Sequence, residues 1–268
     1  MLSKNQVKYI QSLHQKKYRQ QHGVFLVEGA KSVQEVLQSD FQTELVVATD
    51  AFYKENSRLT DHQRTPVEIA SAADLERIGT LDSNNAALAV VKTKDNRPLV
   101  AGPGEIALIL DDIRDPGNLG TILRIADWYG VRTILCSETT ADVYNPKVIS
   151  ASKGSFTRVR WWYGDVAKFL SQLRARSGDG AAFRPAIAVD QSVSPVYGAF
   201  LDGADVHTLS FEPSGYLIMG NESNGISPAV EPYVTQRITI PRYGGAESLN
   251  VGIATAVLLD NWRRDLHK

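Results

Sequence analysis

The stretch YLIMGNESNGISP, residues 216–228, decides how the second half of this 268-residue chain is interpreted. Its first four residues are apolar and typical of a buried strand, and the glycines and asparagines after them are typical of a tight turn. Ser227-Pro228 is a good helix start, with a cap followed by proline. These features leave Glu222 unexplained, except as a carboxylate bound by nearby backbone amides. The stretch therefore predicts a strand, a turn that holds an acid, and a helix.

Two other turns have the same design. The apolar run 106–110 leads into DDIRDPGNLG (residues 111–120), and the run 237–240 leads into PRYGGAESLN (residues 241–250). We expect Asn118 to cap the helix after the first turn and Ser248 to cap the helix after the last one. Asn250 is poorly explained by helix preference. Arg124 points away from the apolar stripe of its helix, where it can bind a phosphate or ribose or form an ordinary surface salt bridge.

The alternation of strands and helices predicts an α/β protein of two domains. In the first part, strands are expected at 23–27, 44–48 and 86–91, with helices at 7–13, 32–37 and 74–78. The segment 92–104 combines charged residues with proline and glycine, as linkers do, so we place the boundary near residue 98.

Apolar strands alternating with helices in the second part predict a parallel sheet covered on both faces. The strands are expected at 106–110, 132–136, 157–161, 186–189, 216–219 and 237–240. Ligands of such sheets bind beyond the carboxyl ends of the strands, which is where all three turns lie.

Composition narrows the class of protein. The chain is 43% hydrophobic and 22% charged, as globular proteins are, and it has neither a long apolar run nor an apolar N-terminal leader, so we expect a cytoplasmic protein. The single Cys136 excludes an internal disulfide and is expected to be buried. The five histidines are scattered, and no nucleotide-binding glycine motif is present, so neither a metal nor a nucleotide cofactor is expected.

The net charge of −1 does not indicate a nucleic-acid-binding protein, but its distribution is uneven. Before the first acid, Glu28, the chain carries the basic residues Lys4, Lys8, Lys16, Lys17 and Arg19. A local basic patch of this kind can bind phosphates. The alternative interpretation is a solvated helix face.

The three turns resemble the motifs of the SpoU-type (TrmH-like) RNA ribose 2'-O-methyltransferases of the SPOUT superfamily. The first motif of that family, N-x-G-x-x-x-R, is matched by Asn118, Gly120 and Arg124. The second, G-N-E-x-x-G, is matched within residues 220–225, and the third, E-S-L-N-V, by residues 247–251. Residues 145–155 also resemble the family, so the likeness spans essentially the whole chain.

This resemblance implies a C-terminal α/β methyltransferase domain, residues 99–268, whose parallel sheet ends in a deep trefoil knot, one of the rare exceptions to unknotted folds. It implies a homodimer that binds S-adenosylmethionine. The predicted cofactor-binding residues are Ile218, Gly220, Asn221, Ile240 and Leu249. The predicted catalytic residues are Arg124, which stabilises developing charge, Asn118, Ser248 and Asn250, which position groups, and Glu222, which braces its loop.

The N-terminal part, residues 1–98, resembles the family's ribosomal-protein-like RNA-binding domain, and Lys16, Lys17 and Arg19 are its predicted RNA contacts. A departure from the family occurs at 83–87, where relatives often have proline and glycine. The implied reaction is methylation of a ribose 2'-OH in structured RNA, with ribosomal RNA favoured over transfer RNA. The alternatives are a catalytically silent RNA-binding protein of the same fold and an enzyme that methylates a base nitrogen.

Overall fold

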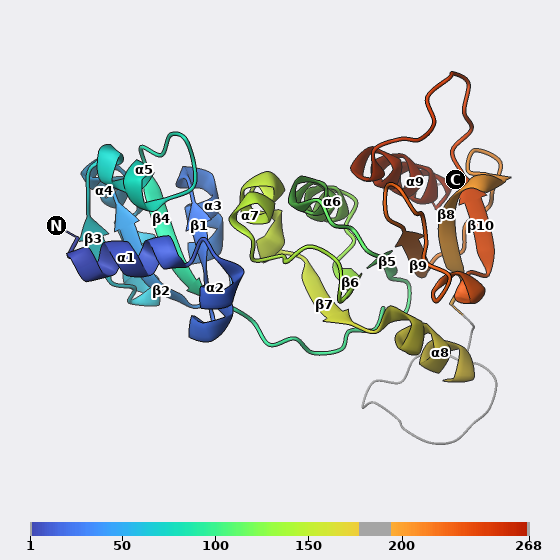
Figure 1. Ribbon diagram of the computed structural model, residues 1–268, viewed down its shortest axis with the longest axis horizontal. Helices are drawn as coiled ribbons and strands as arrows, with labels where there is room; N and C mark the ends of the chain where they lie inside the picture. The colour runs from blue at the N-terminus through green and yellow to red at the C-terminus, as the bar shows by residue number, and fades with distance from the viewer. Residues whose placement is uncertain (1, 177–193, 267–268) are drawn as a thin grey trace. The chain divides into compact units, whose positions relative to one another are not determined.

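The chain folds into two compact units (Figure 1). The computed structural model describes residues 2–176 and 194–266. Unit 1 consists of Met1–Asp95 and Asp142–Arg158, and unit 2 consists of Asn96–Ala141 and Val159–Lys268. The chain therefore crosses between the units after Asp95, Ala141 and Arg158.

Unit 1 contains a four-stranded sheet with the strand order β1-β4-β2-β3. Strand β4 pairs antiparallel with β1 and β2, and β2 pairs parallel with β3. The strands are β1 (Val24–Glu28), β2 (Thr43–Ala48), β3 (Val67–Ile69) and β4 (Ala87–Lys92). The helices are α1 (Lys4–Ser12), α2 (Lys16–His22), α3 (Ala30–Leu37), α4 (Asp50–Gln63) and α5 (Ala72–Ile78). All the elements expected from the sequence of this part are present, whereas α2, α4 and β3 were not expected.

Residues from the middle of the chain complete the core of unit 1. Helix α7 (Pro146–Ser152) and the short helix η1 (Ser155–Thr157) belong to this unit. The ring of Phe156 lies 6.0 Å from that of Phe25 and 5.7 Å from that of Phe41. Gly154 has φ +93°, and a Cβ there would lie 2.8 Å from Cγ of Glu35, so this turn requires glycine.

Two polar residues fix the turn that leads to β4. The buried carboxylate of Glu28 accepts hydrogen bonds from the backbone N and the hydroxyl of Thr80. The buried amide of Asn84 donates to the carbonyl of Ala87 and accepts from the N–H of Ala86. Asn84 therefore stabilises the turn at which relatives were expected to have proline and glycine.

Unit 2 contains a six-stranded sheet with the order β10-β8-β9-β5-β6-β7, and every neighbouring pair is parallel. The strands are β5 (Ile106–Leu110), β6 (Thr133–Ser137), β7 (Arg160–Gly164), β8 (Val196–Asp205), β9 (Gly215–Met219) and β10 (Gln236–Thr239). The predicted parallel α/β sheet is confirmed. The strand expected at 186–189 lies outside the described residues, and β8 was not expected.

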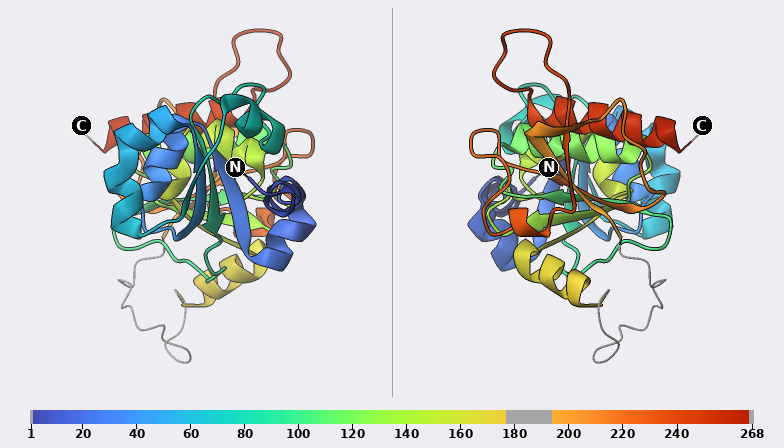
Figure 2. Two further views of the ribbon diagram at one scale, coloured as in Figure 1. Left: turned by 90° about the vertical axis from the view of Figure 1, so that its left-hand side faces the viewer. Right: turned by 90° about the vertical axis from the view of Figure 1, so that its right-hand side faces the viewer.

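Helices cover this sheet on both sides. Helices α6 (Pro116–Trp128) and α9 (Val251–Asp265) pack against each other on one side, and α8 (Val166–Arg176) lies on the other (Figure 2). Phe169 and Leu170 of α8 pack in one buried cluster with Ile109 of β5 and Ile218 of β9. In the described part of the chain, no helix has the length and apolarity needed to cross a membrane.

The caps of α6 and α9 differ from those predicted. Asp115 caps α6 by accepting from the N–H of Asn118, and Pro116 takes the first helical position. Asn250 caps α9 by accepting from the N–H groups of Gly252 and Ile253. The predicted capping roles of Asn118 and Ser248 were therefore wrong. Asp-Pro is the stronger start signal for α6, because a carboxylate binds the free N–H groups and proline lacks one.

Candidate active site

Three loops leave the carboxyl ends of their strands in unit 2. The first loop (residues 111–118, which includes the first turn of α6) follows β5, the second loop (220–227) follows β9, and the third loop (240–250) follows β10. Parallel strands bring these ends to one edge of the sheet, and β5 pairs directly with β9.

The second loop folds back on itself tightly. Asn221 and Gly225 exchange two backbone hydrogen bonds of 2.9 Å, and Gly225 has φ +68°. A Cβ on Gly220 would lie 2.3 Å from the backbone carbon of Gly225, so no other residue fits there. The side-chain oxygen of Asn221 accepts from the N–H groups of Ser223 and Asn224, which explains why the loop begins with Gly-Asn.

Side chains from all three loops meet at Asn118, and we call this contact the asparagine junction. The Nδ2 of Asn118 donates to Oε1 of Glu222 at 2.5 Å, and its Oδ1 accepts from Nδ2 of Asn250 at 2.8 Å. The amide of Asn118 can donate to a carboxylate and accept from another amide at the same time, because it carries both an NH2 group and a carbonyl oxygen. The junction joins Asn118 to Asn250, which lies 132 positions further along the chain. The sequence related these two residues only through the resemblance of their motifs to the family.

A cavity of about 930 Å³ lies beside the second and third loops. Its walls include the apolar residues Met219, Ile238 and Leu258 as well as residues of both loops. Among the predicted cofactor-binding residues, Gly220, Asn221, Ile240 and Leu249 line it, together with the predicted catalytic residues Glu222 and Ser248.

Ile218 is the exception among the predicted cofactor-binding residues. It is fully buried in β9 and packs in the core with Ile109 and Phe169 rather than lining the cavity. Successive residues of a strand point to opposite faces, so its neighbour Met219 lines the cavity instead. The side chain of Ile218 therefore does not line the cavity, and the role of this residue in cofactor binding stays a prediction.

Arg124 lies on the exposed surface of α6, as its position off the apolar stripe predicted. Within the part of the chain that the structure describes, its guanidinium forms neither a hydrogen bond nor an ion pair. The alternative of a surface salt bridge is thus not observed among these residues. Two apolar side chains on α6 and α9 are also exposed, namely Trp128 at 84% and Ile253 at 55%.

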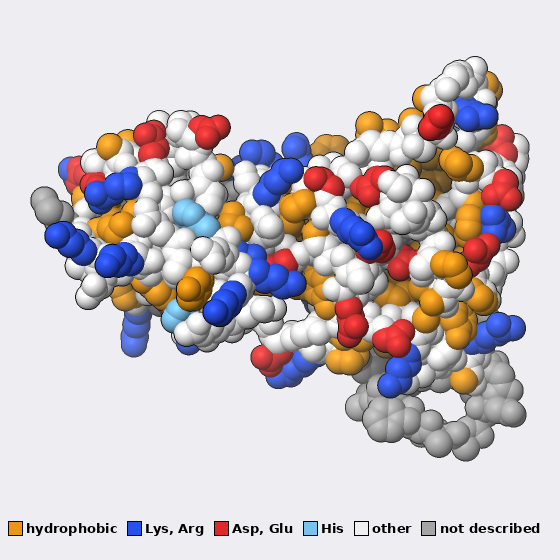
Figure 3. Space-filling model, viewed as in Figure 1, with side chains coloured by type: hydrophobic (Ala, Val, Ile, Leu, Met, Phe, Trp, Pro, Cys, Tyr) orange, Lys and Arg blue, Asp and Glu red, His pale blue; other side chains and the backbone are white. Residues whose placement is uncertain are grey.

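The three predicted RNA contacts of unit 1 separate into two groups. Lys16 and Lys17 are exposed, as are Lys4 and Lys8, and Figure 3 shows Lys and Arg side chains spread over this unit. Arg19 is only 3% exposed and pairs with Asp142 at 2.6 Å. The prediction that Arg19 contacts phosphate is therefore wrong, because its guanidinium is buried.

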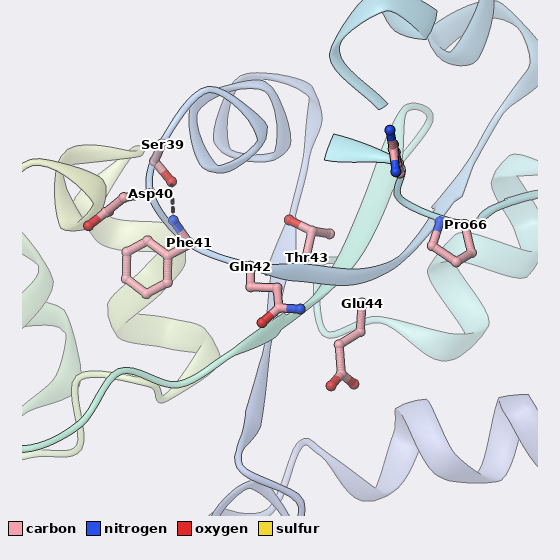
Figure 4. A pocket seen from close by; sticks show the side chains of 8 residues that line it. Ser39, Asp40, Phe41, Gln42, Thr43, Glu44 and Pro66 are labelled. Atoms are coloured by element: carbon pink, nitrogen blue, oxygen red, sulfur yellow. Dashed lines mark hydrogen bonds between the residues drawn. The ribbon is translucent and has the colours of Figure 1, made fainter. Parts of the chain in front are cut away.

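Unit 1 also has an open hollow of about 500 Å³ beside β2 (Figure 4). It is lined by Ser39, Asp40, Phe41, Gln42, Thr43, Glu44, Arg64 and Pro66. Lys94 pairs with Asp40 at 2.6 Å and lies over the ring of Phe41. None of the predicted site residues lies in this hollow.

Sequence reasoning missed the acids of the first loop. Asp111 is buried and accepts from the N–H of Ser227 at 2.7 Å, which ties the first loop to the second. The backbone oxygen of Asp112 accepts from Nδ2 of Asn221 at 2.9 Å. The signal was the run Asp111-Asp112 directly after a buried strand, because acids at such a strand end seldom lack partners.

Among the described residues, neither Cys136 nor a histidine lines the cavity. Cys136 is buried in β6, as predicted, and burial raises the pKa of its thiol to about 12. Among the described residues, no group of three or more His, Cys, Asp or Glu side chains is placed to hold a metal ion.

Comparison with known proteins identifies the family. Residues 105–260 match the SpoU rRNA Methylase family, and residues 4–89 match the MRM3-like substrate binding domain. The chain belongs to the SpoU rRNA methylase family, which confirms the resemblance found in its motifs. The predicted class, an S-adenosylmethionine-dependent RNA methyltransferase, is confirmed with it.

Individual relatives cover nearly the whole chain. It is 28% identical over 97% of both chains to the 23S rRNA (guanosine(2553)-2'-O)-methyltransferase RlmP of Bacillus subtilis. A TrmH-family structure from Porphyromonas gingivalis superposes with a TM-score of 0.82 at 36% identity, covering 98% of this chain and 99% of its own. An AdoMet-bound rRNA methyltransferase from Sinorhizobium meliloti superposes with a TM-score of 0.84 at 27% identity, covering 99% of this chain and 97% of its own.

Proposed function

We propose that the protein transfers a methyl group from S-adenosylmethionine to a ribose 2'-OH of ribosomal RNA. The observation that carries this proposal is the asparagine junction next to the cavity of about 930 Å³. A polar cluster on a rigid sheet edge, beside a cavity large enough for a nucleoside, is the arrangement that positions two substrates. The names of relatives that methylate 23S rRNA favour ribosomal over transfer RNA.

The residues of the cavity fit the proposed cofactor. Its volume lies within the range of about 300–1,000 Å³ that small-molecule sites have. Apolar walls from Ile240 and Leu249 suit an adenine ring. A Cβ on Gly225, Gly244 or Gly245 would meet nothing within 4 Å, so the loop backbone is open to a ligand. Bound S-adenosylmethionine would supply an electrophilic methyl group.

The chain's own residues orient the hydroxyl and stabilise its developing charge. We assign charge stabilisation to Arg124, because a guanidinium stays protonated and presents a planar set of donors. Ser248 and the asparagine junction position the ribose, and Glu222 holds Asn118 in one orientation. Orientation of reacting groups and preorganised charge are the main sources of rate enhancement in such a transfer.

We further propose that the enzyme is a homodimer in which Arg124 acts on the partner's site. In support, Arg124 has no contact with the asparagine junction of its own chain among the described residues. The exposed Trp128 and Ile253 lie on α6 and α9, and such apolar side chains are typical of a covered interface. Mixed dimers of Arg124→Ala and Asn250→Ala subunits should regain activity, because one of their two sites is intact.

Unit 1 is proposed to bind the RNA through the exposed Lys16 and Lys17, a role supported by the substrate-binding family that residues 4–89 match. We also propose that the C-terminal segment passes through a trefoil knot. The strand order in which β10 lies outside β8 while α9 returns to pack on α6 supports this topology.

The test is methyl transfer from labelled S-adenosylmethionine to unmodified 23S rRNA, 16S rRNA and tRNA transcripts, followed by nuclease digestion and nucleoside chromatography. We expect a 2'-O-methylated nucleoside from rRNA alone, and its loss with Arg124→Ala while the cofactor still binds. A methylated base would favour the base-nitrogen alternative. Binding of RNA without any transfer would favour the silent RNA-binding alternative.

A further inference from the structure

Asp112 in the first loop adopts an unusual backbone conformation. Its φ of +63° lies in the left-handed region, which costs an L-residue roughly 1–2 kcal/mol although aspartate tolerates it better than most. Among the described residues, the other positions in this region are glycines, such as Gly130 and Gly225, and the helix C-caps Arg64 and Lys153. Asp112 is therefore the one non-glycine residue there that does not end a helix. Retention of a side chain at Asp112 indicates that its carboxylate has a function.

The carboxylate of Asp112 joins two residues of the site edge. Its Oδ1 accepts from Nε of Arg114 at 2.9 Å, and its Oδ2 lies 3.3 Å from Nδ2 of Asn221, which lines the cavity. The N–H of Asp112 donates to the hydroxyl of Ser137 at 2.8 Å. Asp112 is therefore fixed from β6 and from the second loop, and it connects Arg114 to the wall of the cavity.

Arg114 differs from the other ion-paired arginines in the nitrogen that it uses. Arg19 and Arg237 contact their partners through both terminal nitrogens, whereas Arg114 contacts Asp112 through Nε alone. Its side chain is 68% exposed, and among the described residues its Nη1 and Nη2 have no partner. The ion pair thus fixes the plane of the guanidinium and leaves its outer edge, with two parallel N–H donors, facing solvent.

Two other acids of the first and second loops have partners of their own. The carboxylate of Asp111 accepts a hydrogen bond from the N–H of Ser227, and that of Glu222 accepts one from the side chain of Asn118. Partial burial raises the pKa of the Asp112 carboxyl, but the hydrogen bonds from Arg114 and Thr139 outweigh it and hold this pKa below its usual value. The carboxylate is therefore ionised at neutral pH and continues to hold the arginine.

We propose that Arg114, oriented by Asp112, binds the substrate RNA next to the methylated ribose through a pair of adjacent acceptors. Two sources present such a pair, the oxygens of one phosphate and the O6 and N7 atoms of one guanine. Arg114 touches the substrate in this proposal, and Asp112 is a positioning residue. The proposal rests on the proposed function, since it names an RNA contact of the same site.

The experiment compares Arg114→Ala with Arg132→Ala in the full-length enzyme. Arg132 is also exposed, but it precedes β6 and so lies at the opposite edge of the sheet. We expect Arg114→Ala to raise the KM and the Kd for a 23S rRNA transcript at least about fivefold, with little change in kcat or in cofactor affinity. Arg132→Ala should behave like the wild type.

Asp112→Gly tests the positioning role, because glycine keeps the left-handed backbone and removes only the carboxylate. We expect it to weaken RNA binding as Arg114→Ala does, and the double variant to be no weaker than either single variant. Full additivity would mean that Asp112 does not act through Arg114 and would overturn that part of the proposal. Because Arg114→Ala leaves the backbone of the loop unchanged, the RNA contact is tested even if Asp112→Gly does not fold.

A transcript made with 7-deazaguanosine separates the two sources, since it lacks N7. If only the wild type loses affinity for it, the acceptors belong to guanine. If neither the wild type nor Arg114→Ala loses affinity for it, and Arg114→Ala lowers the slope of log affinity against log salt by about one, the acceptors belong to a phosphate. Equal binding and methylation by the Arg114→Ala and Arg132→Ala variants would overturn the proposal. Absence of methylation by the wild type would instead contradict the proposed function.

Discussion

Replacement of Arg19 by alanine tests whether this residue of α2 stabilises the fold or binds RNA phosphate. Arg19 donates to the backbone oxygens of Leu13 and His14 at 3.1 and 2.9 Å and to Oδ2 of Asp142 at 2.6 Å. Asp142 begins the segment that completes the core of unit 1. The side chain therefore ties the end of α1 to residues that lie 123 positions further along the chain.

The expected loss of stability follows from the burial of this pair. The side chain of Arg19 is 3% exposed and that of Asp142 is 17% exposed, so the substitution leaves a mostly buried carboxylate without its counter-ion. Removal of one partner from a buried ion pair typically costs about 3–5 kcal/mol. Two backbone oxygens also lose their donor, so we expect the free energy of unfolding to fall by about 4 kcal/mol, within that range.

Urea unfolding monitored by circular dichroism measures the change, and Asp142→Asn completes a double-mutant cycle. The coupling energy should be about 1–3 kcal/mol, as it is for residues in one buried network. Lys17→Ala is the matched control from the same helix. It should leave stability within about 0.5 kcal/mol of the wild type and weaken RNA binding at low salt. An Arg19→Ala variant of undiminished stability that binds RNA weakly would refute the structural role and restore the predicted phosphate contact.

Three further changes test the site. Asn250→Asp should keep the cap of α9, since both residues cap well. It should lower kcat by about 10²-fold, because no donor remains for Asn118. Normal turnover would show that the asparagine junction is dispensable. Gly220→Ala should abolish cofactor binding and destabilise the fold by about 1–3 kcal/mol, because its Cβ would lie 2.3 Å from the backbone of Gly225. Gly244→Ala is the control, and it should leave stability unchanged because its Cβ would meet nothing within 4 Å. Cys136, whose pKa is raised to about 12 by burial, should resist iodoacetamide at pH 8 in the native protein and react in urea; rapid native alkylation would contradict its burial in β6.

The parallel sheet and the three loops could be predicted from local pattern. The runs 106–110 and 216–219 are apolar throughout, as expected for strands covered on both faces, and both form as predicted. Helix α4 was missed because its sequence, DAFYKENSRLTDHQ, contains few apolar residues and therefore has only a weak periodic signal. Residues 142–158 belong to unit 1, where Phe156 packs against Phe25 and Phe41. No local sequence pattern encodes packing between residues so far apart in the chain.

The candidate site could be predicted in its residues but not in its contacts. The motifs identified Asn118, Glu222 and Asn250, and the structure joins all three by hydrogen bonds. The basic run of residues 4–19 gave no means of separating Lys16 and Lys17 from Arg19, because charge alone does not indicate which side chain a distant acid will bind. The motif also gave no means of predicting which way the side chain of Ile218 points, since a shift of one residue along a strand moves a side chain to the other face.

The two wrong caps have a common physical cause, which also explains why the site contains two asparagines. A helix cap needs only an acceptor, and Asp115 supplies one to α6 without using any donor. Asn118 is thereby free to use both ends of its amide between Glu222 and Asn250. The oxygen of Asn250 accepts from the first N–H groups of α9, and its nitrogen donates to Asn118. Aspartate could therefore replace it as a cap but not in the junction, because an ionised carboxylate has no donor. The cap that starts α9 is therefore also the contact that positions the third loop against the first.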